Sequence, residues 1–231
     1  MRIDCLSIFP DMIGDALSHS IPGKAQEKGL LTIAQHNIRD YATDKHHKVD
    51  DIPYGGGVGM VFKPEPVVRA IQAVTTPGAL VIHPSPAAPP LTQKDIIELA
   101  GYTHLIFLAS RYEGLDQRVV DHYVDREYSL GDYVISGGEL AVAVMIDAVV
   151  RLMPGAIGKE ESYREDSFYA GILDHPHYTR PADFEGLKVP EVLQSGNHAK
   201  IETWRREQAL MRTRRFRPDL LKEDPNADHR K

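Results

Sequence analysis

Short apolar runs alternate along the first two thirds of the chain with stretches in which apolar residues recur every three or four positions. The short runs predict strands at residues 3–9, 31–35, 80–83 and 105–109. The periodic stretches predict helices at residues 11–18, 64–74, 92–100 and 139–152, the last of which is strongly apolar and ends before Pro154-Gly155. Strands separated by helices of about ten residues are typical of a parallel sheet covered on both faces, so we expect an α/β fold.

The pattern changes after residue 157. Residues 158–171 hold four acidic side chains within seven positions and show little periodicity, which is typical of an exposed linker. Residues 199–214 then predict a helix with charges on one side and with Ile201, Trp204, Ala209 and Leu210 on the other. We therefore expect an α/β domain at 1–157, a flexible linker at 158–171 and a small, mainly helical domain at 172–231.

The composition is that of an ordinary soluble globular protein. A length of 231 residues fits one large domain and a small one, at roughly 150 residues per domain. Cys5 is the only cysteine, which excludes an intrachain disulfide and a multi-cysteine zinc site. The N-terminus is too acidic for a secretory signal, and no apolar run reaches the roughly 20 residues that span a membrane, so we expect a cytoplasmic protein.

The charge is unevenly distributed. The net charge of −6 argues by itself against a nucleic-acid partner, but all of it lies in residues 1–158, and residues 159–231 are neutral overall. Residues 197–217 carry seven basic side chains against two acidic ones, which indicates a binding surface for a polyanion. A solvated helix face is the alternative explanation of this charge run.

Three glycine-containing segments, at 54–60, 110–118 and 130–139, are candidates for ligand binding. The first lacks the lysine of a phosphate-binding loop and the third glycine of the dinucleotide fingerprint, but its glycines permit positive φ and close approach of a ligand. A mobile surface loop is the other interpretation. The other two segments border predicted strands and the apolar helix, where α/β sheets bind ligands. We expect a nucleotide-like ligand pocket there, with free backbone amides at Ser136-Gly137-Gly138.

The remaining polar residues that could serve as metal ligands or catalytic groups do not form a complete site in the sequence. His46 and His47 have no third ligand at a useful spacing, and Asp174, His175 and His177 show no further ligand, so we expect no structural metal site. Asp166 in the linker and Arg151 at the end of the apolar helix have ordinary explanations as a solvated acid and a helix C-terminal charge.

Seven segments taken together indicate a particular protein family more specifically than any one of them does. In chain order they are VDDIPYGGGVGM, SRYEGLDQR, GDYVISGGEL, EDSF, LDHPHYTRP, VPEVLQSGNHAKIETWR and RTRRFRPDLL. With them the chain closely resembles the TrmD family of bacterial tRNA (guanine-N1)-methyltransferases, from residue 8 to about residue 221. The resemblance implies a SPOUT-type α/β fold with a parallel sheet and a deep trefoil knot, working as a homodimer. Knots are rare in proteins, and this one is expected only through the family.

The resemblance also implies the cofactor and its site. S-adenosylmethionine is the expected methyl donor, held by the knot loops through Ser85, Pro86, Ser110, Glu113, Leu130, Gly131, Asp132, Tyr133, Val134, Ile135, Gly137 and Gly138. The expected reaction is methylation of N1 of guanosine 37, the nucleotide 3′ of the anticodon. Asp166 is the expected general base, and Arg151 is expected to stabilise charge on O6. A base within the linker suggests a gate that orders when cofactor and tRNA are both present.

The expected partner is the anticodon stem-loop of tRNA. Residues expected to contact it are Asp50, Tyr54, Gly55, Gly59, His177, Lys200, Arg205, Arg212, Arg214 and Arg215. In the implied dimer, Asp166 acts on cofactor held by the other subunit. Magnesium is expected from the family as an aid to tRNA structure, to deprotonation or to both, although no acidic cluster indicates a dedicated site.

Several positions depart from the family pattern. Pro84, Ala87, Ala88 and Ser110 replace a usual leucine, glutamine, glycine and glycine, which puts individual adenine contacts in question. Three other functions are weaker interpretations: an RNA-binding module without catalysis, another nucleotide-using α/β enzyme, and a SPOUT enzyme that methylates a ribose 2′-oxygen. Retention of Asp166 and Arg151 argues against the first, and the missing Walker lysine argues against the second.

Overall fold

The computed structural model describes residues 1–157 and 166–221. The chain divides into two compact units, Met1–Gly158 and Lys159–Lys231. Most of the predicted linker, residues 158–165, lies outside the described residues, as do residues 222–231.

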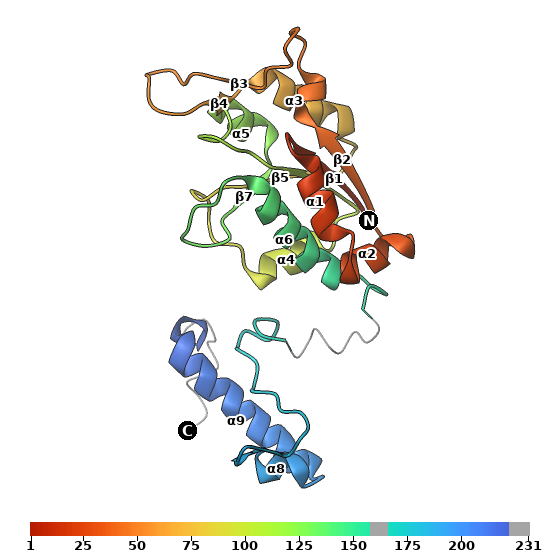
Figure 1. Ribbon diagram of the computed structural model, residues 1–231, viewed down its shortest axis with the longest axis vertical. Coiled ribbons are helices and arrows are strands. Elements are labelled where there is room, and N and C mark those ends of the chain that lie inside the picture. The colour runs from red at the N-terminus through yellow and green to blue at the C-terminus, as the bar shows by residue number, and fades with distance from the viewer. Residues whose placement is uncertain (158–165, 222–231) are drawn as a thin grey trace. The chain divides into compact units, whose positions relative to one another are not determined.

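Five parallel strands form the sheet of the first unit, in the order β2-β1-β6-β5-β7 (Figure 1). They are β1 (Arg2–Ser7), β2 (Thr32–Asn37), β5 (Leu80–Pro84), β6 (His104–Leu108) and β7 (Arg126–Tyr128). Strands β5 and β6 are buried along their whole length, which explains why they are continuous apolar runs in the sequence. The predicted parallel α/β sheet is confirmed, and each predicted strand lies within two residues of an observed one.

Helices cover both faces of this sheet (Figure 1). One face carries α1 (Pro10–Leu17), α2 (Ser20–Glu27), α4 (Gln93–Leu99) and α6 (Gly138–Arg151); the other carries the 3₁₀ turn η1 (Ile38–Tyr41), α3 (Pro64–Val74) and α5 (Gln117–Tyr123). Alternate residues of β6 point to opposite faces, so Phe107 packs in one apolar cluster and Ile106 in the other. A short antiparallel ribbon, β3 (Asp50–Asp51) and β4 (Val61–Phe62), carries the 54–60 glycine segment between its strands.

Six elements of the first unit were not predicted from the pattern: α2, η1, β3, β4, α5 and β7. Helix α2 contains Pro22 and Gly23, which disfavour a helix by propensity. A Cβ on Gly23 would lie 2.4 Å from the Ser18 carbonyl oxygen, so close packing on the preceding turn requires a glycine there. The short elements α5 and β7 lie in a mostly polar stretch, and α5 begins where the Asp116 side chain accepts a hydrogen bond from the Arg118 amide at 3.0 Å.

A buried carboxylate joins three strands of the sheet. Asp4 of β1 accepts a hydrogen bond from Arg2 Nε at 2.7 Å and lies 2.7 Å from ring nitrogens of His36 on β2 and His104 on β6. Burial raises the pKa of the Asp4 carboxyl, but the hydrogen bonds from Arg2, His36 and His104 outweigh burial and lower that pKa below its ordinary value. This cluster was not recognised in the sequence.

The described part of the second unit is built around one long helix. It contains the hairpin β8 (Asp183–Phe184) and β9 (Leu187–Lys188), the turn α8 (Glu191–Gln194), the helix α9 (His198–Phe216) and the 3₁₀ turn η2 (Pro218–Leu221). The predicted helix at 199–214 is confirmed and extends slightly at both ends, whereas the hairpin was not anticipated. Only Ala209 and Thr213 of α9 are buried.

Among the described residues, no helix has both the length and the apolar character needed to cross a membrane.

Candidate functional site

A cavity of about 350 Å³ opens at the carboxyl ends of β5, β6 and β7. Eleven of the twelve residues predicted to bind the cofactor line it: Ser85, Pro86, Ser110, Glu113, Leu130, Gly131, Tyr133, Val134, Ile135, Gly137 and Gly138. Asp132 is the exception, since it is not among the lining residues. Three loops that are far apart in the sequence thus meet at one cavity.

Backbone hydrogen bonds hold two of these loops together. The amide of Ser85 donates to the Tyr128 carbonyl at 3.0 Å, and the amide of Ser129 donates to the Pro89 carbonyl at 2.8 Å. The amide of Leu91 donates back to the Ser129 carbonyl at 2.8 Å. The chain after β5 and the chain after β7 therefore form one wall of the cavity. Because these bonds join backbone groups, the wall does not depend on particular side chains.

The two glycines at the start of α6 allow the helix to pack closely on the loop after β6. The amide of Gly138 donates to the Ser110 carbonyl at 2.7 Å, and a Cβ at this position would lie 3.0 Å from the Ser110 nitrogen. A Cβ on Gly137 would lie 2.7 Å from Cγ of Arg111. The expectation of free amides here is wrong for Gly138, because α6 begins by packing directly on the loop after β6.

A buried ion pair fixes this contact. Glu139 in the first turn of α6 is 1% exposed and lies 3.1 Å from Nε of Arg111. The Ser7 hydroxyl donates to Glu139 at 2.7 Å, and the Arg111 guanidinium lies 4.6 Å from the centre of the Phe9 ring. The negative charge also stands at the positive end of the helix dipole. Neither Arg111 nor Glu139 was singled out from the sequence, in which each is one charged residue among many.

A second polar chain runs through the wall of the cavity. His83 at the end of β5 places Nδ1 2.9 Å from Oε1 of Glu127 and Nε2 2.9 Å from Oγ of Ser110. Of these three residues, only Ser110 was predicted from the sequence to bind the cofactor. His83 and Glu127 belong to different strands, and only the parallel pairing of β5 with β7 places them opposite one another.

The glycine segment adjoins the same cavity through Glu113. Gly55, Gly56, Gly57 and Gly59 all have positive φ, which confirms the conformation expected of them. A Cβ on Gly59 would lie 2.5 Å from a carboxylate oxygen of Glu113, and the Glu113 amide donates to the Met60 carbonyl at 2.9 Å. Tyr54 at the tip is fully exposed, and Asp50 lies at the base of the loop in β3.

The predicted basic residues of the second unit lie on α9. Lys200, Arg212, Arg214 and Arg215 are exposed, whereas Arg205 is half-buried. Within the part of the chain that the structure describes, Nε of Arg205 is buried and has no hydrogen-bond partner. Four of the five predicted cations are therefore accessible to a polyanion.

The turn that carries Asp166 is fastened to α9. The Asp174 amide donates to Oγ of Ser167 at 2.9 Å, and the Leu173 amide donates to Oγ1 of Thr213 at 3.0 Å. Asp166 is half-buried at the start of this turn, in the second unit. Arg151 is the last residue of α6, in the first unit.

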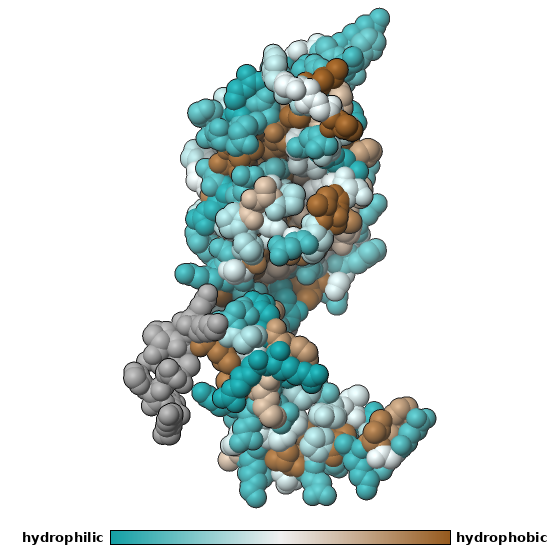
Figure 2. Space-filling model, turned by 90° about the vertical axis from the view of Figure 1, so that its left-hand side faces the viewer, coloured by the Kyte–Doolittle hydropathy of each residue, from teal (hydrophilic) through white to brown (hydrophobic). Residues whose placement is uncertain are grey.

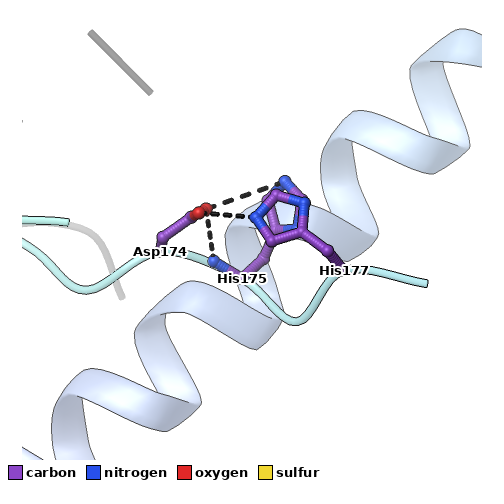
Figure 3. A group of neighbouring side chains, drawn as sticks. All are labelled: Asp174, His175 and His177. Atoms are coloured by element: carbon purple, nitrogen blue, oxygen red, sulfur yellow. Dashed lines mark hydrogen bonds and ion pairs between the residues drawn. The ribbon is translucent and has the colours of Figure 1, made fainter. Parts of the chain in front are cut away.

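Asp174, His175 and His177 come together more closely than the sequence indicated (Figure 3). One possible ligand atom from each lies within 4.8 Å of the others. Nε2 of His177 lies 2.6 Å from Oδ2 of Asp174, and the His175 amide donates to Oδ1 at 2.6 Å. Burial raises the pKa of Asp174, but these hydrogen bonds outweigh burial and lower it. Both carboxylate oxygens are thus hydrogen-bonded, and the absence of a structural metal site stays a prediction.

A parallel sheet with a cavity at the carboxyl ends of its strands defines a ligand-binding protein of the α/β class. A family model described as tRNA (Guanine-1)-methyltransferase TrmD matches residues 1–223, and the chain belongs to this family of methyltransferases.

Similar proteins cover nearly the whole chain. The tRNA (guanine-N(1)-)-methyltransferase of Bacillus subtilis is 51% identical over 228 residues, which are 97% of this chain and 94% of the relative. That of Geobacter sulfurreducens is 53% identical over 223 residues, 96% of this chain and 91% of the relative. That of Staphylococcus aureus strain MRSA252 is 50% identical over 231 residues, 99% of this chain and 94% of the relative.

Proposed function

We propose that this protein transfers a methyl group from S-adenosylmethionine to N1 of guanosine 37 in tRNA. The observation that carries the proposal is the cavity where eleven of the twelve predicted cofactor residues meet, in a chain of the tRNA (guanine-N1)-methyltransferase family. A ribose 2′-oxygen methyltransferase is not favoured, because the relatives are named for guanine N1.

The cavity suits S-adenosylmethionine in size and chemistry. About 350 Å³ lies within the range of small-molecule sites. Pro86, Leu130 and Ile135 offer apolar surface for the adenine ring, and Glu113 offers a carboxylate for a cationic group. Bound there, S-adenosylmethionine would supply an electrophilic methyl group.

A residue of the protein must accept a proton during the reaction. Guanine N1 carries hydrogen when neutral and is then a poor nucleophile, so a base must remove that proton as the methyl group moves. We assign this step to the Asp166 carboxylate. Arg151 would stabilise the negative charge that develops on O6.

The exposed cations of α9 would contact phosphates of the anticodon stem-loop, and Lys200, Arg212, Arg214 and Arg215 supply four of them. Asp50, Tyr54, Gly55, Gly59 and His177 would contact the target nucleotide or its neighbours. The base must leave the stack to reach the cavity. Tyr54 is fully exposed on the loop whose Gly59 packs against Glu113, a residue that lines the cavity.

We also propose the knotted SPOUT topology, the homodimer and the three-part organisation at 1–157, 158–171 and 172–231. Membership of the TrmD family supports the knot, and the hydrogen-bonded wall is where the chain after β5 lies against the chain after β7. Leu140 and Val144, one turn apart on α6, are each more than half exposed and support a subunit contact beside the cavity. In the dimer, Asp166 would act on cofactor held by the partner, with 158–171 as the gate.

The decisive test is methyl transfer from labelled S-adenosylmethionine to a tRNA transcript with guanosines at positions 36 and 37. Asp166→Asn is measured in parallel, and a transcript with adenosine at position 37 is the matched control. We expect transfer to disappear with adenosine 37 and to fall at least about a hundredfold in Asp166→Asn. Transfer to adenosine 37, or full activity in Asp166→Asn, would contradict the substrate or the base respectively. Omitting magnesium from the same assay tests the expected requirement for that ion.

A further inference from the structure

We propose that Ser110 binds the cofactor through a hydroxyl oxygen that acts as an acceptor, and that His83 and Glu127 set the direction in which this hydroxyl points. The inference rests on the proposed function, because it concerns the same cavity. Ser110 is thereby a binding residue, and His83 and Glu127 are positioning residues behind it.

The three side chains form an ordered chain from solvent to cavity. The Glu127 side chain is 32% exposed and the His83 side chain is only 5% exposed. His83 lies between Glu127 and Ser110, with 2.9 Å to each. His83 and Ser110 both line the cavity, from the end of β5 and from the loop after β6.

The donor and acceptor roles follow from the chemistry of the groups. An ionised carboxylate only accepts hydrogen bonds, so Nδ1 of His83 must carry the hydrogen that it donates to Glu127. In the neutral ring, Nε2 then has a free lone pair and accepts from the Ser110 hydroxyl. The hydroxyl hydrogen is held toward His83, and the remaining lone pairs of Oγ are left for the cavity.

Neutral His83 therefore makes Ser110 an acceptor for a ligand N–H or O–H group, such as an amine or a ribose hydroxyl. When His83 takes up a proton, Nε2–H donates to Ser110, and the serine hydrogen must turn toward the cavity. The polarity of the contact is reversed. We expect cofactor to bind more weakly in that state, since an accepting oxygen is replaced by a donating hydroxyl facing a donor.

Other charged groups near this chain are engaged elsewhere. Arg111 and Glu113 follow Ser110 and line the same cavity, but Arg111 is paired with Glu139, and Glu113 packs on Gly59. Arg126, beside Glu127 on β7, pairs with Glu98 and donates to the Tyr128 hydroxyl at 3.2 Å. Glu127 is thus the charged group in contact with the His83 ring within the described residues.

The same bonding order occurs in serine hydrolases, where the serine is a nucleophile. The two roles can be separated experimentally, because a nucleophile would cleave an activated ester and a positioning chain would only change binding.

The test measures binding of S-adenosylhomocysteine to the full-length protein by calorimetry at pH 7.5 and pH 5.5. For the wild type, we expect the dissociation constant to rise about fivefold at the lower pH. Ser110→Ala should bind about fivefold more weakly at pH 7.5 and lose the pH dependence, and His83→Gln should also lose the pH dependence. Ser110→Thr keeps a hydroxyl and should retain it. His122→Gln, an exposed histidine on α5, is the matched control and should behave like the wild type.

An Ser110→Ala protein with wild-type affinity and an unchanged pH profile would overturn the inference. So would release of nitrophenol from p-nitrophenyl acetate that depends on Ser110, which would make the serine a nucleophile. A wild type that binds no S-adenosylhomocysteine at either pH would instead contradict the proposed function.

Discussion

The two units of the molecule bury their apolar residues to very different extents. The first has an apolar cluster on each face of its sheet, and the large side chains of Phe62 and Phe107 are fully buried there. In the second, large apolar side chains such as Leu187, Met211 and Phe216 are half or more exposed. Some apolar residues reach the surface among hydrophilic ones in both units (Figure 2), so the difference between the units lies in what is buried.

This difference indicates how each unit keeps its shape. The core of the first unit holds three loops around a cavity of about 350 Å³, a size typical of small-molecule sites. The described part of the second unit depends on a few contacts to α9, such as the Leu173–Thr213 hydrogen bond and the packing of Trp204 near the rings of His175 and Tyr178. A preformed cavity suits a cofactor. A basic surface that is stabilised by few contacts suits a large polyanion, because it can adapt to the partner's shape.

Separating the two units should produce the largest effect on folding. We expect residues 1–158 alone to unfold in one cooperative thermal transition, because both apolar clusters lie within them. Residues 159–231 alone should show no cooperative transition, because too little apolar surface is buried to offset chain entropy. Circular dichroism melts of the two fragments test this, and a sharp transition in the smaller fragment would show a core that the described residues do not contain.

Removing the buried charge of the sheet should have the next largest effect. Asp4→Asn leaves His36, His104 and Arg2 without their carboxylate, and we expect a loss of about 3 kcal/mol in the free energy of unfolding at pH 7. Because the folded-state pKa of Asp4 is lowered, its stabilisation is present above the ordinary aspartate pKa of about 3.9 and is lost as pH falls through the lower folded value. Denaturant titrations of both proteins should therefore converge at acid pH, and a constant difference down to the lowest pH would refute this account.

A smaller change tests how the second unit is held. Thr213→Val removes the acceptor for the Leu173 amide, and we expect a local loss of about 1 kcal/mol. Hydrogen exchange at Leu173 should become about fivefold faster. Thr203→Val is the matched control, since the Thr203 hydroxyl donates only within its own helix, to Ala199 at 3.0 Å. Equal effects of the two variants would mean that the contact does not anchor the turn.

The smallest expected effect concerns the basic surface. Arg212→Gln should weaken tRNA binding modestly and reduce the slope of log affinity against log salt by about 0.7–0.9. Arg69→Gln, an exposed arginine of the first unit, should leave that slope unchanged. Filter binding over a range of salt concentrations compares them, and identical slopes for both variants would locate the phosphate contacts away from α9.

The local sequence pattern was sufficient to predict an element wherever the spacing of its apolar residues reflects which of its positions are buried. Strands β5 and β6 could be predicted because a fully buried parallel strand is apolar at every position, and α9 because its half-buried face recurs at helical spacing. Helix α2 could not, because its glycine is there for contact with Ser18 rather than for helix propensity.

The candidate site divides in the same way. Its loops could be found from glycines and from family motifs, which are local in the chain. The partners behind those loops could not, because Glu127, His83 and Ser110 are joined only by the order of the strands. The Gly138 amide likewise looked free in the sequence and is bound to Ser110 in the fold.

The α/β class, the elements with strong periodicity and the family can all be identified from the sequence alone. Which side chains share a hydrogen bond, which backbone amides have a partner and which charges are buried depend on the tertiary structure. Periodicity and motifs reflect interactions among residues that are close in the chain. A hydrogen bond between distant residues depends on distances of a few ångströms, which the packing of the whole sheet sets.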